Sequence, residues 1–107
     1  MPEEYAVFFQ LFNQQKYFEA HEVLEALWRK DDGESRHFYQ GLIQIAAVFV
    51  HLQRGNKEGA FILFQKARKH LEGYPPFYMG LSLSNLLRDV PDSIEQCVSG
   101  YKIEVTL

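Results

Sequence analysis

The sequence predicts an all-α fold, a compact bundle of about five helices, and three observations support this prediction. Apolar residues recur at spacings of three and four, most clearly over 57–71. Residues 41–50 are apolar nearly all round, which is typical of a central helix covered by its neighbours. Glycine-containing breakers such as Asp31-Asp32-Gly33 separate the periodic segments.

The first predicted helix covers 3–12. Pro2 suits the first turn of a helix, where its missing N–H would be unpaired in any case. Glu3 and Glu4 then lie at the positive end of the helix dipole. The second predicted helix covers 17–30, because basic residues fill its last turn and a breaker follows.

The third helix is predicted over 35–54 and the fourth over 57–71. Gly55 ends the third, and Asn56 caps the fourth. Short C-terminal helices are expected over 82–99, the first from about 82 to 90 and a last turn or two from 92 to 99.

The C-terminal residues 101–107 alternate between apolar and polar side chains, which is the period of a strand. A single strand has no sheet to join in a helical domain, and its backbone groups need partners. We therefore favour an extended arm that lies over the bundle. The alternative is pairing with the same arm of a second copy.

A faint internal repeat is also present. The segment Phe38-Tyr39-Gln40-Gly41-Leu42 returns as Phe77-Tyr78-Met79-Gly80-Leu81. Arrays of helical hairpins have periods of this size. Two weak copies are fewer than an array needs, so we expect a compact bundle with helical-hairpin character, and coincidence is a serious alternative.

Composition bounds the functional classes. The 107 residues suffice for one domain with its own core, and the single cysteine, Cys97, favours a reducing compartment. We expect a cytoplasmic protein with no membrane span, because the N-terminus lacks a basic region and no 18-residue window is apolar enough. The net charge of −3 makes nucleic acid an unlikely partner, and Lys66, Arg68 and Lys69 suit a solvated helix face.

Two ionisable side chains interrupt the apolar face of the second helix. His21 and Glu25 lie four residues apart, so they project from adjacent turns. A buried histidine and carboxylate are costly unless they are hydrogen-bonded or paired. We therefore expect a buried polar site. Trp28 follows one turn later, where an aromatic residue is more often part of a core than of a ligand site.

The third helix carries a narrow polar stripe, formed by Gln40, Gln44 and His51. One interpretation is that the stripe is simply the exposed edge of this helix. The other is that it faces His21 and Glu25 across a helix interface and satisfies the buried carboxylate.

Metal binding and catalysis are weaker hypotheses. His21 and Glu25 could share a metal ion in a site that His51 completes, but position 25 is not the second histidine of a zinc-protease motif. Di-iron bundles need Glu-x-x-His on two helices; Glu22 and Glu25 have a spacing that suits carboxylate ligands, but no second such helix is present. We expect no cofactor. His21 and Glu25 could also act as an acid–base couple, yet no nucleophile or glycine-rich phosphate loop accompanies them.

Several motifs occur together in order. They are Tyr17-Phe18-Glu19-Ala20-His21-Glu22-Val23-Leu24-Glu25 with Trp28, then Arg36, Gly41-Leu42-Ile43-Gln44, His51 and Arg54-Gly55-Asn56. Over about 8–72 the chain resembles domain-of-unknown-function family 309. The resemblance implies a small all-helical cytosolic domain with no assigned activity. It places His21, Glu22, Glu25, Trp28, Gln44 and His51 on signature positions.

We therefore predict a helical binding or scaffold module that self-associates and binds a small polar ligand or a protein partner. Its polar network or pocket is formed by seven residues: His21, Glu22, Glu25, Trp28, Gln40, Gln44 and His51. The alternative is a metal-dependent or acid–base enzyme that acts on a small polar substrate. Ile62 lies away from the inward stripe of its helix and is a candidate contact residue.

Overall fold

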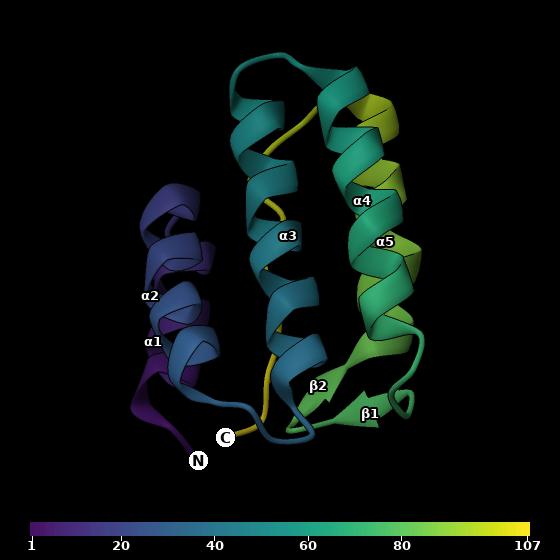
Figure 1. The fold of residues 1–107 in the computed structure, drawn as a ribbon. Coiled ribbons are helices and arrows are strands. Elements are labelled where there is room, and N and C mark those ends of the chain that lie inside the picture. Colours follow the sequence, from purple (N-terminus) through teal and green to yellow (C-terminus); the bar gives the residue numbers. More distant parts are fainter.

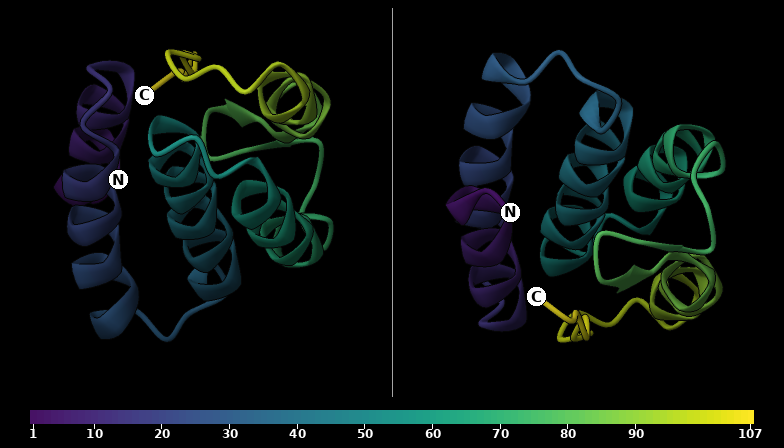
Figure 2. Two further views of the ribbon diagram at one scale, coloured as in Figure 1. Left: turned by 90° about the horizontal axis from the view of Figure 1, so that it is seen from above. Right: turned by 90° about the horizontal axis from the view of Figure 1, so that it is seen from below.

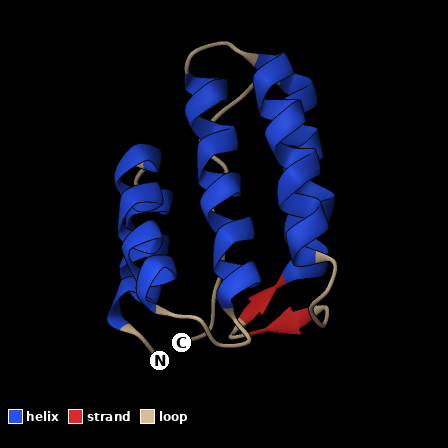
Figure 3. Cartoon of the chain, in the orientation of Figure 1, coloured by secondary structure: helices blue, strands red, loops and turns tan.

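The computed structural model describes residues 1–107 and contains five helices and one short hairpin (Figure 1). The elements are α1 (Glu3–Asn13), α2 (Tyr17–Lys30), α3 (Arg36–Gln53), α4 (Lys57–Leu71), β1 (Phe77–Tyr78), β2 (Leu81–Ser82) and α5 (Leu83–Gln96). The all-α class and the number of helices are confirmed. The two-stranded hairpin was not predicted, and it is confined to one end of the bundle (Figure 3).

Helix α3 lies at the centre of the molecule. Figures 1 and 2 show α2, α3 and α4 side by side on one face, with α1, the C-terminal segment and α5 behind them. Ten of the 18 residues of α3 are buried, as expected for a helix that is apolar nearly all round. Successive helices contact one another, so the bundle is built from helical hairpins.

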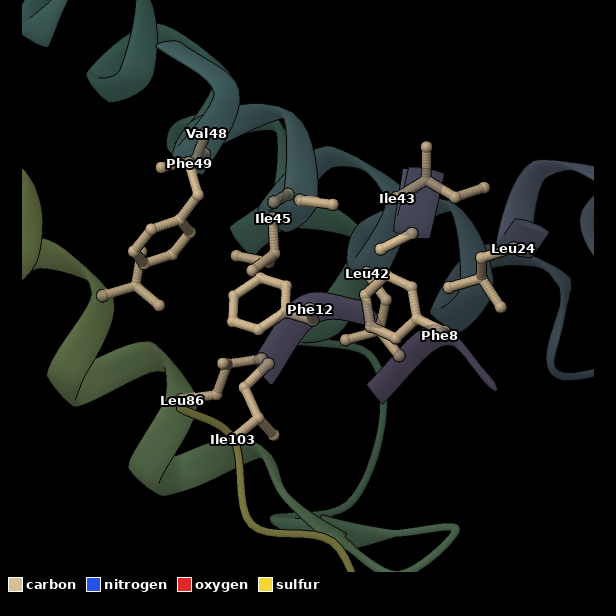
Figure 4. Packing of buried hydrophobic residues seen from close by; sticks show 14 of the residues in the cluster. Phe8, Phe12, Leu24, Leu42, Ile43, Ile45, Val48, Phe49, Leu86 and Ile103 are labelled. Carbon is tan, nitrogen blue, oxygen red and sulfur yellow. The ribbon is translucent and has the colours of Figure 1, made fainter. Parts of the chain in front are cut away.

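Aromatic side chains join α1 to the central helix. Phe12 packs edge-on against Phe49 of α3 with ring centroids 5.2 Å apart, and against Tyr17 of α2 at 4.9 Å. Figure 4 shows Phe8 and Phe12 among buried side chains of α3 and α5, with Ile103 of the C-terminal segment beside them. Full burial of such a side chain contributes about 1.5–3 kcal/mol. This core joins the buried faces of α1, α2 and α3.

The connection between α3 and α4 contains a glycine turn and a helix cap, although α3 ends at Gln53 and not at residue 54. Gly55 has a φ of +72°, a left-handed conformation that glycine adopts without strain. The Asn56 side chain caps α4 by accepting a hydrogen bond of 2.9 Å from the Gly59 amide. None of the helices is both long and apolar enough to cross a membrane.

The C-terminal helices differ from the prediction. Two short pieces were expected over 82–99, but α5 is a single helix that continues through Pro91 and ends at Gln96. Val90 and Ile94 are both buried, so packing on either side of the proline holds the helix continuous. Cys97, with a φ of +53°, terminates the helix and is exposed.

The C-terminal arm lies over its own bundle. Val105 forms an antiparallel bridge with Leu81, and the Thr106 amide donates 2.8 Å to the Gly80 carbonyl. Ile103 is buried, and the Asn13 side chain both donates to its carbonyl and accepts from its amide. The arm therefore finds its backbone partners within the chain.

The sequence match between 38–42 and 77–81 has no structural counterpart. Its first copy lies in α3, whereas its second forms the β1–β2 hairpin, with φ values of +50° at Met79 and +79° at Gly80. Two consecutive positive φ angles define a tight hairpin turn that matches the twist of the strands. The match between the segments is therefore coincidental.

Gly80→Ala should destabilise the protein by more than about 1 kcal/mol, because alanine is strained at positive φ. A Cβ atom at this position would also lie 1.8 Å from the Thr106 carbonyl oxygen. Gly73→Ala is the matched control, since nothing lies within 4 Å of its Cβ position. Urea denaturation of both variants checks this expectation, and equal midpoints would contradict it.

Candidate functional site

The predicted site residues lie mainly along the boundary between α2 and α3, where the surface has two shallow depressions. One, of about 180 Å³, is lined by Phe18, His21, Ala47, Val50, His51 and Arg54. The other, of about 270 Å³, is lined by Glu25, Trp28, Gln40, Ile43 and Gln44. We call the two together the α2–α3 groove. Six of the seven predicted site residues line it, and Glu22 is the exception, because it is exposed on α2.

The His21–Glu25 pair is formed but is not buried. His21 Nε2 lies 3.4 Å from a Glu25 carboxylate oxygen, and Glu25 also pairs with Arg29 one turn later. The His21 and Glu25 side chains remain 29% and 26% exposed. The prediction of a buried pair is therefore wrong. Ala20, Leu24 and Leu27 form the buried face of α2, and the ion pair lies at the edge of that face.

The predicted network across the α2–α3 interface is also corrected. Gln44 hydrogen-bonds His70 of α4 at 2.9 Å, and His51 hydrogen-bonds the Asn56 side chain at 3.1 Å. Helix α3 lies between α2 and α4 on one face of the bundle, so its polar stripe can reach either neighbour (Figure 1). The stripe lines the groove beside α2 and makes these hydrogen bonds toward α4.

Two buried nitrogen atoms in the groove residues have no hydrogen-bond partner in the chain. They are His21 Nδ1 and Trp28 Nε1. The rest of Trp28 is firmly held, because the Arg36 guanidinium lies 4.4 Å from its ring centroid and donates to its carbonyl oxygen at 2.8 Å. An unpaired buried polar atom costs about 1–3 kcal/mol, so each one calls for a specific explanation.

The predicted metal ligands do not form a centre. Nowhere in the chain do three or more histidine, cysteine, aspartate or glutamate side chains gather closely enough to hold a metal ion. His21 and His51 line the same depression, but Glu25 lines the neighbouring one and is paired with Arg29. Cys97 and every serine lie outside the groove, so no nucleophile accompanies the acid–base couple.

A second histidine pair, which the sequence analysis missed, lies on the other side of α3. The rings of His37 and His70 are stacked with their centroids 6.0 Å apart. Burial lowers the pKa of His70, and the nearby His37 lowers it further. The two residues come from different helices, so helical spacing gives no signal for this pair.

The outer face of α4 carries exposed apolar side chains. Phe61 and Ile62 are each 52% exposed, which agrees with the outward position assigned to Ile62. Phe61, Pro91 and Ile94 also line a depression between α4 and α5. Self-association stays a prediction. The exposed apolar side chains of α4 offer a surface on which a second copy of the chain can pack.

Comparison with known proteins places the chain in a family. The family model described as a domain of unknown function, DUF309, matches residues 5–63. The chain belongs to the DUF309 family. The match covers α1 to α3 and the first half of α4, and therefore every groove residue, but ends before the hairpin, α5 and the arm.

Two relatives support this assignment. The uncharacterized protein YpuF of Bacillus subtilis is 34% identical over 92 residues, which represent 80% of this chain and 52% of YpuF. The chain thus spans about half the length of that relative. The crystal structure of the conserved hypothetical protein TTHA0068 from Thermus thermophilus is 33% identical, with a TM-score of 0.75 over 88% of this chain and 97% of that one.

His21→Ala should lower the free energy of unfolding by less than about 1 kcal/mol, because the histidine is partly exposed and Glu25 keeps Arg29 as a partner. Leu24→Ala, on the buried face of the same helix, should cost about 2–5 kcal/mol. Urea denaturation measures both values. A His21 variant as unstable as the Leu24 variant would mean that the imidazole is a core residue.

The protein should lose stability in mild acid through His70. The folded pKa of His70 lies below its ordinary value of 6.5, so the unfolded chain binds the proton more readily. The free energy of unfolding therefore falls as the pH drops below about 7 and levels off once the pH is below the folded pKa. His70→Gln should lessen this loss, as measured by urea denaturation at pH values of about 7.5 and 5.5.

His37→Gln serves as a graded control for this measurement. It should lessen the acid loss by a smaller amount, because burial is the larger cause of the lowered pKa of His70. If the free energy of unfolding has the same pH dependence in the native chain and in both variants, protonation of the His37–His70 pair is not linked to folding.

Proposed function

We propose that this chain is a helical binding module and that the α2–α3 groove binds a small polar ligand. The observation that carries the proposal is the pair of unpartnered nitrogens, His21 Nδ1 and Trp28 Nε1, on side chains that line the groove. Buried polar groups in proteins are nearly always paired with protein atoms or ordered water, so each exception calls for an explanation, of which a bound ligand is one.

The composition of the groove favours binding of a polar molecule. The Gln40 side chain makes no hydrogen bond within the chain, and its amide offers both donors and an acceptor. Ile43, Ala47 and Val50 supply apolar surface between the polar groups. Ligand sites typically combine an apolar lining with a few polar groups that fix the orientation of the ligand.

The family match supports the same location. It covers every groove residue and excludes α5 and the C-terminal arm. Binding is favoured over catalysis because the groove lacks a nucleophile, and because its carboxylate, Glu25, is already paired with His21 and Arg29.

A titration followed by two-dimensional ¹⁵N–¹H NMR tests the proposal. The ¹⁵N-labelled chain is titrated separately with amino acids, nucleotides, sugar phosphates and dicarboxylates. At least one class should shift the amide signals of groove residues, and Gln40→Ala should weaken that binding about fivefold, the effect of one lost hydrogen bond.

Gln65→Ala is the matched control, because Gln65 is exposed on α4 and lies outside the groove. It should leave the affinity unchanged. The proposal fails if no class shifts the groove signals, or if Gln40→Ala and Gln65→Ala have equal effects.

A further inference from the structure

The end of the groove near the start of α2 differs in charge from the other end. Its depression is lined by His21, His51 and Arg54 together with three apolar side chains, and no carboxylate lines it. The carboxylate of Glu25 lines the neighbouring depression, where it pairs with Arg29 as well as His21. This end of the groove therefore presents cationic and hydrogen-bond-donating groups.

Arg54 is the arginine without a partner. Arg29, Arg68 and Arg88 each pair with a carboxylate, and Arg36 donates to two backbone carbonyls. The Arg54 guanidinium takes part in no hydrogen bond or ion pair in the structure, although it borders the depression. A free guanidinium offers two parallel N–H groups whose spacing matches the oxygens of a carboxylate or phosphate.

The hydrogen bonds around Asn56 determine where neutral His51 carries its proton. Asn56 Oδ1 accepts from the Gly59 amide, so the NH₂ group of Asn56 must face His51 Nδ1. His51 Nδ1 is then an acceptor, and the ring proton resides on Nε2. Nε2 is left as a donor with no partner inside the chain. His51 therefore supplies a second donor near Arg54.

An apolar surface adjoins these donors. Phe18 is 57% exposed and stacks on His21, with an angle of 11° between the rings. Ala47 and Val50 line the same depression from α3. An exposed aromatic face beside aliphatic groups suits a flat or apolar molecular body.

From these features we propose that this end of the groove binds an oxyanion, a carboxylate or a phosphate, carried on an aromatic or apolar body. Arg54 and His51 Nε2–H hold the oxyanion, and Phe18 with Val50 packs against the body. The inference rests on the proposed function and specifies the ligand class for one end of the same groove.

The test uses phenyl phosphate and benzoate as probes, and both are titrated into the ¹⁵N-labelled chain. At least one should shift the signals of Phe18, His51 and Arg54, and the shifts with each probe distinguish a phosphate site from a carboxylate site. Phenol lacks the anion and inorganic phosphate lacks the ring, so both should bind more weakly. Raising NaCl from about 25 mM to about 300 mM should weaken binding of the anionic probes.

Arg54→Gln should weaken binding of the better probe at least about fivefold, because a charge-assisted contact is lost. Arg68→Gln, which removes the same charge from an exposed position on α4, is the matched control and should leave binding unchanged. Phe18→Ala should weaken phenyl phosphate or benzoate binding and leave inorganic phosphate binding unchanged. Fingerprint spectra of the free variants verify that each is folded.

Any of four results would overturn the inference: phenol binds as tightly as the anions, the two arginine variants have equal effects, the probe shifts map outside the groove, or neither anion binds. If neutral ligands then still shift Gln40 and Trp28, the groove remains a binding site and only the oxyanion assignment is lost.

Discussion

The structure depends on the burial of α3. A helix that is apolar nearly all round must be covered on most sides. The cover of α3 is formed by α1, α2, α4, α5 and the C-terminal arm. Between the two ends of α3 its polar side chains are Gln40, Gln44 and His51, which are half-buried and therefore lie where the cover is incomplete. That place is the face on which α2, α3 and α4 run side by side (Figure 1). The position of the groove thus follows from the one polar edge of an otherwise apolar helix.

Helical periodicity predicted most of the bundle, because each helix buries one face and ends at a recognisable residue. Gly55 and Asn56 illustrate this well, since one ends α3 and the other caps α4. The hairpin escaped prediction because its turn residues, Met79 and Gly80, are not the usual asparagine–glycine pair. The continuity of α5 through Pro91 depends on tertiary packing of Val90 and Ile94, which overrides the local preference of proline.

Sequence reasoning located the groove residues better than it described their contacts. Angles on a helical wheel show that His21 and Glu25 adjoin the buried face of α2, but not how far the neighbouring helix covers them. The partners of the α3 stripe were also beyond reach, because they depend on where α4 lies. Gln44 forms a hydrogen bond with His70 of α4. His51 forms one with Asn56, the residue that caps α4. Both partners therefore belong to α4 or its cap, and neither belongs to α2.

The contacts toward α4 have a consequence for the groove on the other side of α3. Asn56 has a structural role, because its side chain caps α4. The Asn56 oxygen accepts a hydrogen bond from the Gly59 amide, so its NH₂ group donates to His51 Nδ1. The ring proton of neutral His51 then lies on Nε2. A helix cap in one interface thereby determines the hydrogen-bonding character of a ring that lines the groove. Arg54, one residue beyond the end of α3, is positioned by the same turn, whose geometry Gly55 makes accessible. The α3–α4 connection, which the family match includes in full, therefore sets the backbone position of Arg54 and the position of the ring proton of neutral His51.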